Sequence, residues 1–206
     1  ISEAKTYTYT YAVDDSQTYT VTYTAGEGGS VSPTSESDQV LSTTAITGST
    51  ATAAEGYAFD GWYKGETLLG AVEGGETLTA ALAKANLNKT DADNYAATEY
   101  TAKFAKDDNG DGIPDKYQVA VTFKVENGSW NDETAEEITV YVNLYDEDGN
   151  LAEDGSGNLS EAQIPAVGEK PAEGYKVGAW DTTPDTTTAI SEAKTYTYTY
   201  AVDDSQ

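Results

Sequence analysis

The sequence predicts a mainly β (α+β) fold of two small modules in tandem, with one short helix in the first. Apolar and polar residues alternate with a period of two over several segments, and Gly-rich turns separate these segments. Residues 1–17 recur without a change at residues 190–206, an offset of 190 − 1 = 189. Such a long exact repeat is typical of strung or stacked modules, so a scaffold, stalk or adhesin is favoured over an enzyme.

Tyr and Thr alternate most clearly at residues 195–200, where three Tyr fall on one face of a strand and three Thr on the other. The same pattern predicts four further strands, at residues 19–23, 100–104, 119–123 and 138–144. Residues 76–87 differ, because Leu78, Leu82 and Ala85 have helical spacing among good helix formers. We expect one short amphipathic helix there.

A weaker repeat lies inside the 189-residue period. Residues 21–28 align with residues 121–128, and the segment GYAFDGW at 56–62 aligns with GYKVGAW at 174–180. The period therefore divides into two diverged modules. The predicted boundaries are an end strand and linker of a preceding repeat at 1–17, the first module at 18–105, an acidic linker at 106–118, the second module at 119–201, and a linker to the next repeat at 202–206.

Three segments of the first module, VTYTAGEGGSVSP, EGYAFDGW and EYTAKFA, together resemble the internalin B-repeat type of module in the divergent form found in bacterial surface proteins. The second module matches this pattern less well, because Val177 replaces a Phe and Ala179 precedes the Trp. The resemblance implies a β-grasp-like domain that is used as a repeated extracellular spacer. It also implies a location outside the cell, secreted or attached to the cell wall. From the duplication we expect neighbouring copies of the same repeat as partners, and host or matrix glycans or proteins as partners of other domains.

The linker holds the clearest candidate site, a calcium loop. Oxygen ligands at positions 1, 3, 5 and 9, a Gly at position 6 and a backbone carbonyl at position 7 match the spacing of a Ca²⁺ loop. It resembles the type 3 thrombospondin-like loop, and Gln118 stands where an EF-hand has its bidentate Glu. The alternative is a solvated acidic linker. The expected ligands are Asp107, Asn109, Asp111, the carbonyl of Ile113, and Asp115.

The composition excludes several functions. The formal charge of −25, with every cation a Lys, repels phosphate backbones and anionic lipids, so we expect no nucleic-acid partner and no membrane insertion. His and Cys are absent, which excludes Ser-His and Cys-His catalysis and imidazole metal sites. We therefore expect no enzyme. The main expectation is a stalk repeat of a bacterial adhesin-like protein, stiffened by calcium at the linker.

Two alternatives remain open at this point. The first is a glycan- or protein-binding surface module, in which Trp130, which follows a turn and has no aromatic counterpart in the first module, is the candidate contact. Trp62 and Trp180 occupy matching positions and are expected in the cores. The second alternative is a self-assembling extracellular filament. Whichever alternative holds, we expect the duplicated strand at residues 5–11 to be held by hydrogen bonds to another strand, in this chain or in a neighbouring copy, with Tyr7, Tyr9 and Tyr11 as the contact residues.

Overall fold

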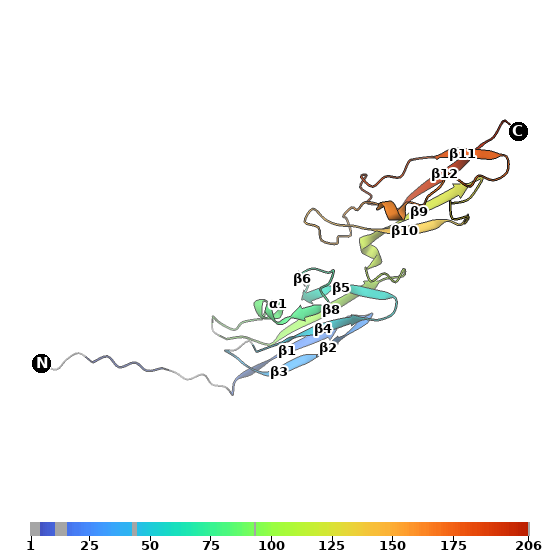
Figure 1. Ribbon diagram of the computed structural model, residues 1–206. Coiled ribbons are helices and arrows are strands. Elements are labelled where there is room, and N and C mark those ends of the chain that lie inside the picture. The colour runs from blue at the N-terminus through green and yellow to red at the C-terminus, as the bar shows by residue number, and fades with distance from the viewer. Residues whose placement is uncertain (1–4, 11–15, 43–44, 93, 206) are drawn as a thin grey trace. The chain divides into compact units, whose positions relative to one another are not determined.

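The mainly β fold is confirmed in the computed structural model of the chain (Figure 1), which describes residues 5–10, 16–42, 45–92 and 94–205. The chain divides into two compact units. The first unit consists of Ile1–Ala54 and Asp60–Phe104, and the second of Glu55–Phe59 and Ala105–Gln206.

The larger sheet at the N-terminal side has the strand order β3-β1-β8-β5-β6. β1 lies between β3, with which it pairs antiparallel, and β8, with which it pairs parallel. A second, three-stranded sheet has the order β2-β4-β7. The bounds of these strands are β1 Thr18–Ala25, β2 Gly29–Ser32, β3 Ser35–Val40, β4 Gly48–Ala53, β5 Tyr57–Lys64, β6 Thr67–Leu69, β7 Thr77–Thr79 and β8 Thr98–Lys106.

The second unit has one four-stranded sheet, of order β10-β9-β12-β11. β9 pairs antiparallel with β10 and parallel with β12, and β12 pairs antiparallel with β11. Its strands are β9 Gln118–Glu126, β10 Ile138–Asn143, β11 Tyr175–Trp180 and β12 Lys194–Val202, and short 3-10 turns lie at Asp115–Tyr117 and Glu161–Gln163.

The two larger sheets share one plan. In each, the first and last strands of the module are central and parallel, β1 with β8 and β9 with β12. The aligned segments at residues 56–62 and 174–180 form the corresponding strands β5 and β11. An equivalent hydrogen bond also follows the last strand of each module. The Asp107 N–H donates to the Gly56 carbonyl at 3.2 Å, and the Asp203 N–H donates to the Gly174 carbonyl at 2.9 Å. This shared plan supports the internal repeat seen in the sequence, and a β-grasp-like module remains the prediction for each.

The single α-helix among the described residues, α1 (Ala80–Ala85), lies within the predicted helical segment but is shorter. The prediction of a helix from residue 76 is wrong at its start, because Thr77–Thr79 form β7 and pair with β4. Thr79 then caps the helix, since its hydroxyl accepts a hydrogen bond from the Leu82 N–H at 3.3 Å. Thr79 therefore marks the boundary between strand and helix, because it pairs with Gly48 in the sheet and also caps the helix.

Aromatic side chains fill both cores. In the first, Tyr23 stacks on Tyr100 at 6.0 Å and meets Trp62 edge-on at 6.2 Å. Trp62 is buried, as predicted, and Trp180 is half-buried against the second core. The predicted Tyr face of β12 is also confirmed, because its three Tyr are buried. The buried cluster of the second core is Val121, Phe123, Trp130, Val142, Leu159, Ile190 and Tyr196.

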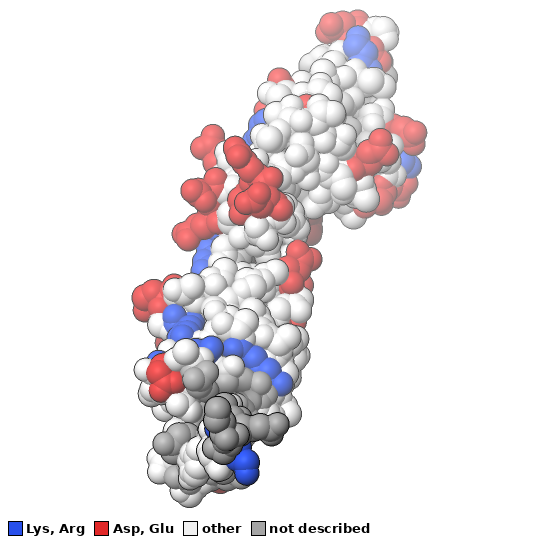
Figure 2. Space-filling view, turned by 90° about the vertical axis from the view of Figure 1, so that its left-hand side faces the viewer, with Lys and Arg blue, Asp and Glu red and all other residues white. Residues whose placement is uncertain are grey.

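Charge is uneven along the chain. Residues 119–206 contain 18 Asp and Glu and 4 Lys, a net charge of −14, whereas residues 18–105 contain 11 Asp and Glu and 4 Lys, a net charge of −7. Figure 2 shows one face, on which carboxylates are prominent over the second unit. Among the described residues, no helix is long and apolar enough to cross a membrane.

Candidate functional site

The candidate calcium loop follows β8 directly and is organised around Asp107. This carboxylate is 6% exposed and accepts three backbone hydrogen bonds from the loop. Its Oδ1 accepts from the N–H groups of Gly110 (2.7 Å) and Asp111 (3.2 Å), and its Oδ2 accepts from Gly112 (2.9 Å). Gly110 and Gly112 both have positive φ, 74° and 87°, which L side chains rarely adopt. The loop is thus wrapped tightly around its first carboxylate.

Gln118 closes the other side of the loop. It is 8% exposed, and its Nε2 donates to Asp111 Oδ2 at 2.6 Å and to Asn143 Oδ1 at 2.8 Å. Its Oε1 accepts from Asn109 Nδ2 at 2.9 Å. The residue at the twelfth position therefore supplies a buried amide and ties the loop to β10, where an EF-hand has a carboxylate ligand.

The structure brings the predicted ligands into one loop but does not gather them around one point. Asp107, Asn109 and Asp111 share hydrogen bonds, whereas Asp115 Oδ2 accepts from the Asp108 N–H at 3.0 Å. Among the described residues, no three acidic side chains lie close enough together to hold a metal ion. The donors suit a hard cation by chemistry, yet in the described arrangement they are held by hydrogen bonds within the loop.

Trp130 is not an exposed contact, and that prediction is wrong. Its side chain is 1% exposed, its ring lies 6.1 Å from Trp180, and its Nε1 donates to the Glu136 carbonyl at 2.9 Å. The burial arises because the chain after β9 folds back under a distant loop, with a β-bridge between Gly128 and Pro171. Trp180 is only half-buried, so Trp130 supplies the fully buried indole that Trp62 supplies in the first unit.

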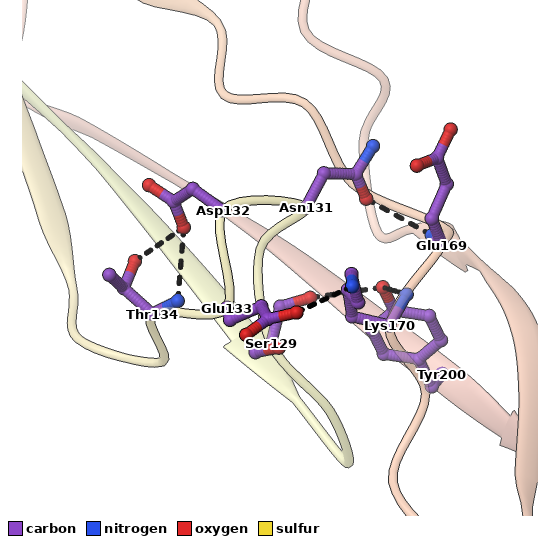
Figure 3. Close-up of polar contacts among 8 residues, drawn as sticks. All are labelled: Ser129, Asn131, Asp132, Glu133, Thr134, Glu169, Lys170 and Tyr200. Atoms are coloured by element: carbon purple, nitrogen blue, oxygen red, sulfur yellow. Dashed lines mark hydrogen bonds and ion pairs between the residues drawn. The ribbon is translucent and has the colours of Figure 1, made fainter.

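A network of polar contacts joins the loop at residues 128–134, which contains Trp130, to the loop at residues 168–172 (Figure 3). The Tyr200 hydroxyl accepts from the N–H groups of Gly168 and Lys170 and donates to the Ser129 carbonyl, each at 3.0 Å. Lys170 Nζ forms an ion pair with Glu133 Oε1 at 2.7 Å, and this hydrogen bond raises the pKa of Lys170. The Asn131 Oδ1 also accepts from the Glu169 N–H at 3.0 Å.

The sequence did not predict these contacts between the two loops. The alternation of Tyr and Thr predicted only that Tyr200 lies on the buried face of a strand. The Tyr200 hydroxyl links the two loops, because it forms hydrogen bonds with both the loop at residues 128–134 and the loop at residues 168–172. A shallow pocket of about 430 Å³ lies here, lined by Gly128, Ser129, Glu133, Lys170, Pro171 and Ala172. Its polar groups bond to one another, so the arrangement is suited to holding the loops in place.

The duplicated N-terminal segment forms no strand in its described part, residues 5–10. Tyr7 and Tyr9 are 87% and 80% exposed. Tyr11, the third predicted contact, lies outside the described residues. The expected contact with a neighbouring copy therefore remains a prediction, and pairing with a strand of the same chain is not observed in residues 5–10.

Comparison with known families adds one finding that bears on function. Residues 19–83 match the Listeria-Bacteroides repeat domain. The matched stretch runs from β1 into α1, so it covers most of the first module and none of the second. Over these residues the chain is thus similar to a repeat of bacterial surface proteins, and the resemblance to the internalin B-repeat type stays a prediction. No curated protein and no solved structure matches the chain.

Proposed function

We propose that the chain is a structural spacer, a stalk repeat of a bacterial cell-surface, adhesin-like protein. The observation that carries this proposal is the central parallel pair in each larger sheet. Because the first and last strands run side by side in the same direction, the chain enters at one end of the sheet and leaves at the other. The Listeria-Bacteroides repeat match and the exact duplication support the same proposal.

The extent of each unit follows from the registers. Val21 pairs with Thr98, so β1 begins three residues before this point and β8 ends eight residues after it, eleven in all. Val121 pairs with Lys194, and β9 and β12 give the same eleven residues. At roughly 3.3 Å per residue, each parallel pair spans about 36 Å along the strands. Tension on the chain ends would load its ladder in shear, with many hydrogen bonds sharing the force.

Mechanical unfolding tests this function. The chain contains no Cys, so introduced thiols are unique handles. Handles from Thr18→Cys with Asp108→Cys pull the first unit in shear along β1 and β8. Handles from Thr18→Cys with Val40→Cys join register partners across β1 and β3, so they open the ladder bond by bond and serve as the control. We expect a clearly higher unfolding force for the shear pair, and equal forces would overturn the spacer proposal.

Calcium stiffening of the linker is the finer part of the proposal. Asp107, Asn109, Asp111, the Ile113 carbonyl and Asp115 would hold the ion, which would neutralise the clustered carboxylates and fix the loop backbone. Binding requires Gln118 to release Asp111 and Asn109 to turn its amide oxygen inward. The hydrogen bonds from Gln118 and Asn109 therefore compete with the ion, which favours modest rather than tight affinity.

Thermal unfolding with calcium, with magnesium and with excess chelator tests the linker site. We expect calcium to raise the melting temperature of the second unit and Asp111→Asn to abolish that increase. Asp146→Asn is the matched control, because Asp146 accepts backbone hydrogen bonds in an acidic turn outside the ligand set. Identical melting and superimposable scattering profiles with calcium and with chelator would refute calcium binding.

The glycan-binding alternative now rests on a different surface, because Trp130 is buried. Tyr141 is 40% exposed and lines a pocket of about 460 Å³ together with Asn143, Tyr145, Asn158 and Gln163. Aromatic and amide side chains are the groups that such a ligand would contact. A glycan array with the wild-type chain and with Tyr141→Ala distinguishes this alternative from the spacer, which should bind nothing on the array.

A further inference from the structure

The duplicated segment has the sequence of a strand that is central in the second unit. Residues 5–10 read KTYTYT, as do residues 194–199 of β12. These six residues of β12 pair in parallel with residues 121–126 of β9, from Lys194 opposite Val121 to Thr199 opposite Glu126. On its other side, β12 pairs antiparallel with β11. The described part of the segment therefore contains every side chain that the β9 ladder requires.

The same residues have opposite environments in the two places. Tyr196 and Tyr198 are 2% and 5% exposed, whereas their duplicates Tyr7 and Tyr9 are 87% and 80% exposed. In β12, Tyr196 stacks on Phe123 at 5.6 Å, and the Tyr198 hydroxyl accepts from the Gly178 N–H at 3.0 Å. An exposed Tyr-rich segment with a known buried position for each ring has a well-defined binding site elsewhere.

We propose that residues 5–10 of one copy of this chain occupy the position of residues 194–199 in the second unit of another copy when the resident strand is displaced. The entering strand would run parallel to β9 and antiparallel to β11, in the register of β12. The contact joins an N-terminal segment to a C-terminal unit, so it is heterologous and can continue from copy to copy. This proposal is independent of the spacer function.

The exchange should occur only when the resident strand β12 is less stable in its place than the entering strand. The entering strand gains the contacts that the leaving strand loses, because the two sequences are identical. Association still costs translational and rotational freedom, and the resident strand is held at high effective concentration. The intact chain is therefore expected to remain monomeric, and the exchange should appear when β12 alone is weakened.

The exact duplication supplies a matched set of variants for the test. Tyr196→Asp in the full chain places a carboxylate against Phe123 and weakens only the resident strand. We expect this variant to associate with increasing concentration in analytical ultracentrifugation. Tyr7→Asp makes the same change in the exposed duplicate and should leave the chain monomeric and stable. The double variant should be monomeric with an unfolded second unit, because the donor segment now carries the same defect.

A labelled peptide with the sequence of residues 190–206 makes the test independent of how well Tyr196→Asp folds. We expect the peptide to bind a milder full-chain variant, Tyr196→Ala, on the order of a hundredfold more tightly than the wild-type chain, because truncation of a buried aromatic weakens the resident strand. The peptide should also dissociate the Tyr196→Asp assemblies. Equal association of the single and double variants, or equal peptide binding by Tyr196→Ala and the wild-type chain, would overturn the proposal.

Discussion

Removal of one hydroxyl tests whether Tyr200 holds the loops over the second core. Tyr200→Phe leaves the buried ring in place and deletes only the group at its tip. The deletion leaves the N–H groups of Gly168 and Lys170 and the carbonyl of Ser129 without their partner, each of which now lies 3.0 Å from the hydroxyl oxygen. The substitution should therefore destabilise the second unit without creating a cavity in its core.

The magnitude follows from the number of bonds and their exposure. A typical net contribution is about 1 kcal/mol per hydrogen bond, so three bonds predict a loss of roughly 2–3 kcal/mol. Water can reach part of these groups, because Ser129, Gly168 and Lys170 are all half-buried. For this reason we expect a loss within this range of roughly 2–3 kcal/mol. Complete desolvation of three unpaired backbone groups would cost more.

Urea unfolding followed by tryptophan fluorescence measures this loss, because Trp130 and Trp180 report on the second unit and Trp62 on the core of the first. Tyr196→Phe is the control. Tyr196 is buried in the same strand, and its hydroxyl makes no hydrogen bond to a described residue, so its loss should cost less than about 0.5 kcal/mol. If the two variants lower the free energy of unfolding equally, the proposed role of the Tyr200 hydroxyl is wrong.

Two other changes probe the cores. Burial alone would raise the pKa of Glu36, but hydrogen bonds from Thr47, Tyr23 and Gly48 outweigh it and lower this pKa from 4.5. Because its pKa is lowered on folding, the ionised Glu36 stabilises the first unit at a pH above 4.5, and this stability is lost as the pH falls through the folded-state pKa. Glu36→Gln should therefore make the stability of the first unit depend less on pH in acid unfolding followed by Trp62 fluorescence. Trp130→Ala should lower the stability of the second unit by about 3–5 kcal/mol in urea unfolding, as expected for a buried aromatic, and an unchanged midpoint would contradict its place in the core.

The strands that the sequence predicted best are those buried on one face. All five predicted strands are present, because a period of two in Tyr, Val and Thr translates directly into alternate burial. The edge strand β3 was not predicted. Its sequence, SESDQV, shows no apolar alternation. The strand forms because β1 offers it a backbone partner and because the half-buried Glu36 accepts a hydrogen bond from the Tyr23 hydroxyl.

The errors at the sites share one physical cause, which is contact between residues far apart in the sequence. Trp130 follows a turn and so resembles an exposed residue locally. Its neighbours Ser129 and Asn131, however, donate to the carbonyls of Lys170 and Ala166, more than thirty positions away, and Trp130 lies in the buried cluster of the second core. Gln118 was interpreted only as a departure from the EF-hand pattern. Its bond to Asn143, 25 residues later, shows that it fixes the loop to the sheet. Local spacing predicted the loop residues but could not predict these partners.

The divergence of the two modules is also explained by such contacts. In β11, Gly178 lies so close to β12 that an added Cβ would be 1.8 Å from the Thr199 carbonyl oxygen, and its N–H donates to the Tyr198 hydroxyl. The aligned positions of the first module hold Asp60 in place of this Gly and Ala102 in place of Tyr198. In the second module the large Tyr198 of β12 thus lies beside Gly178 of β11. In the first module the small Ala102 of β8 corresponds to Tyr198, and the larger Asp60 of β5 corresponds to Gly178. The same strand order therefore persists with opposite side-chain sizes, because each sheet needs only that the paired positions fill the space between them.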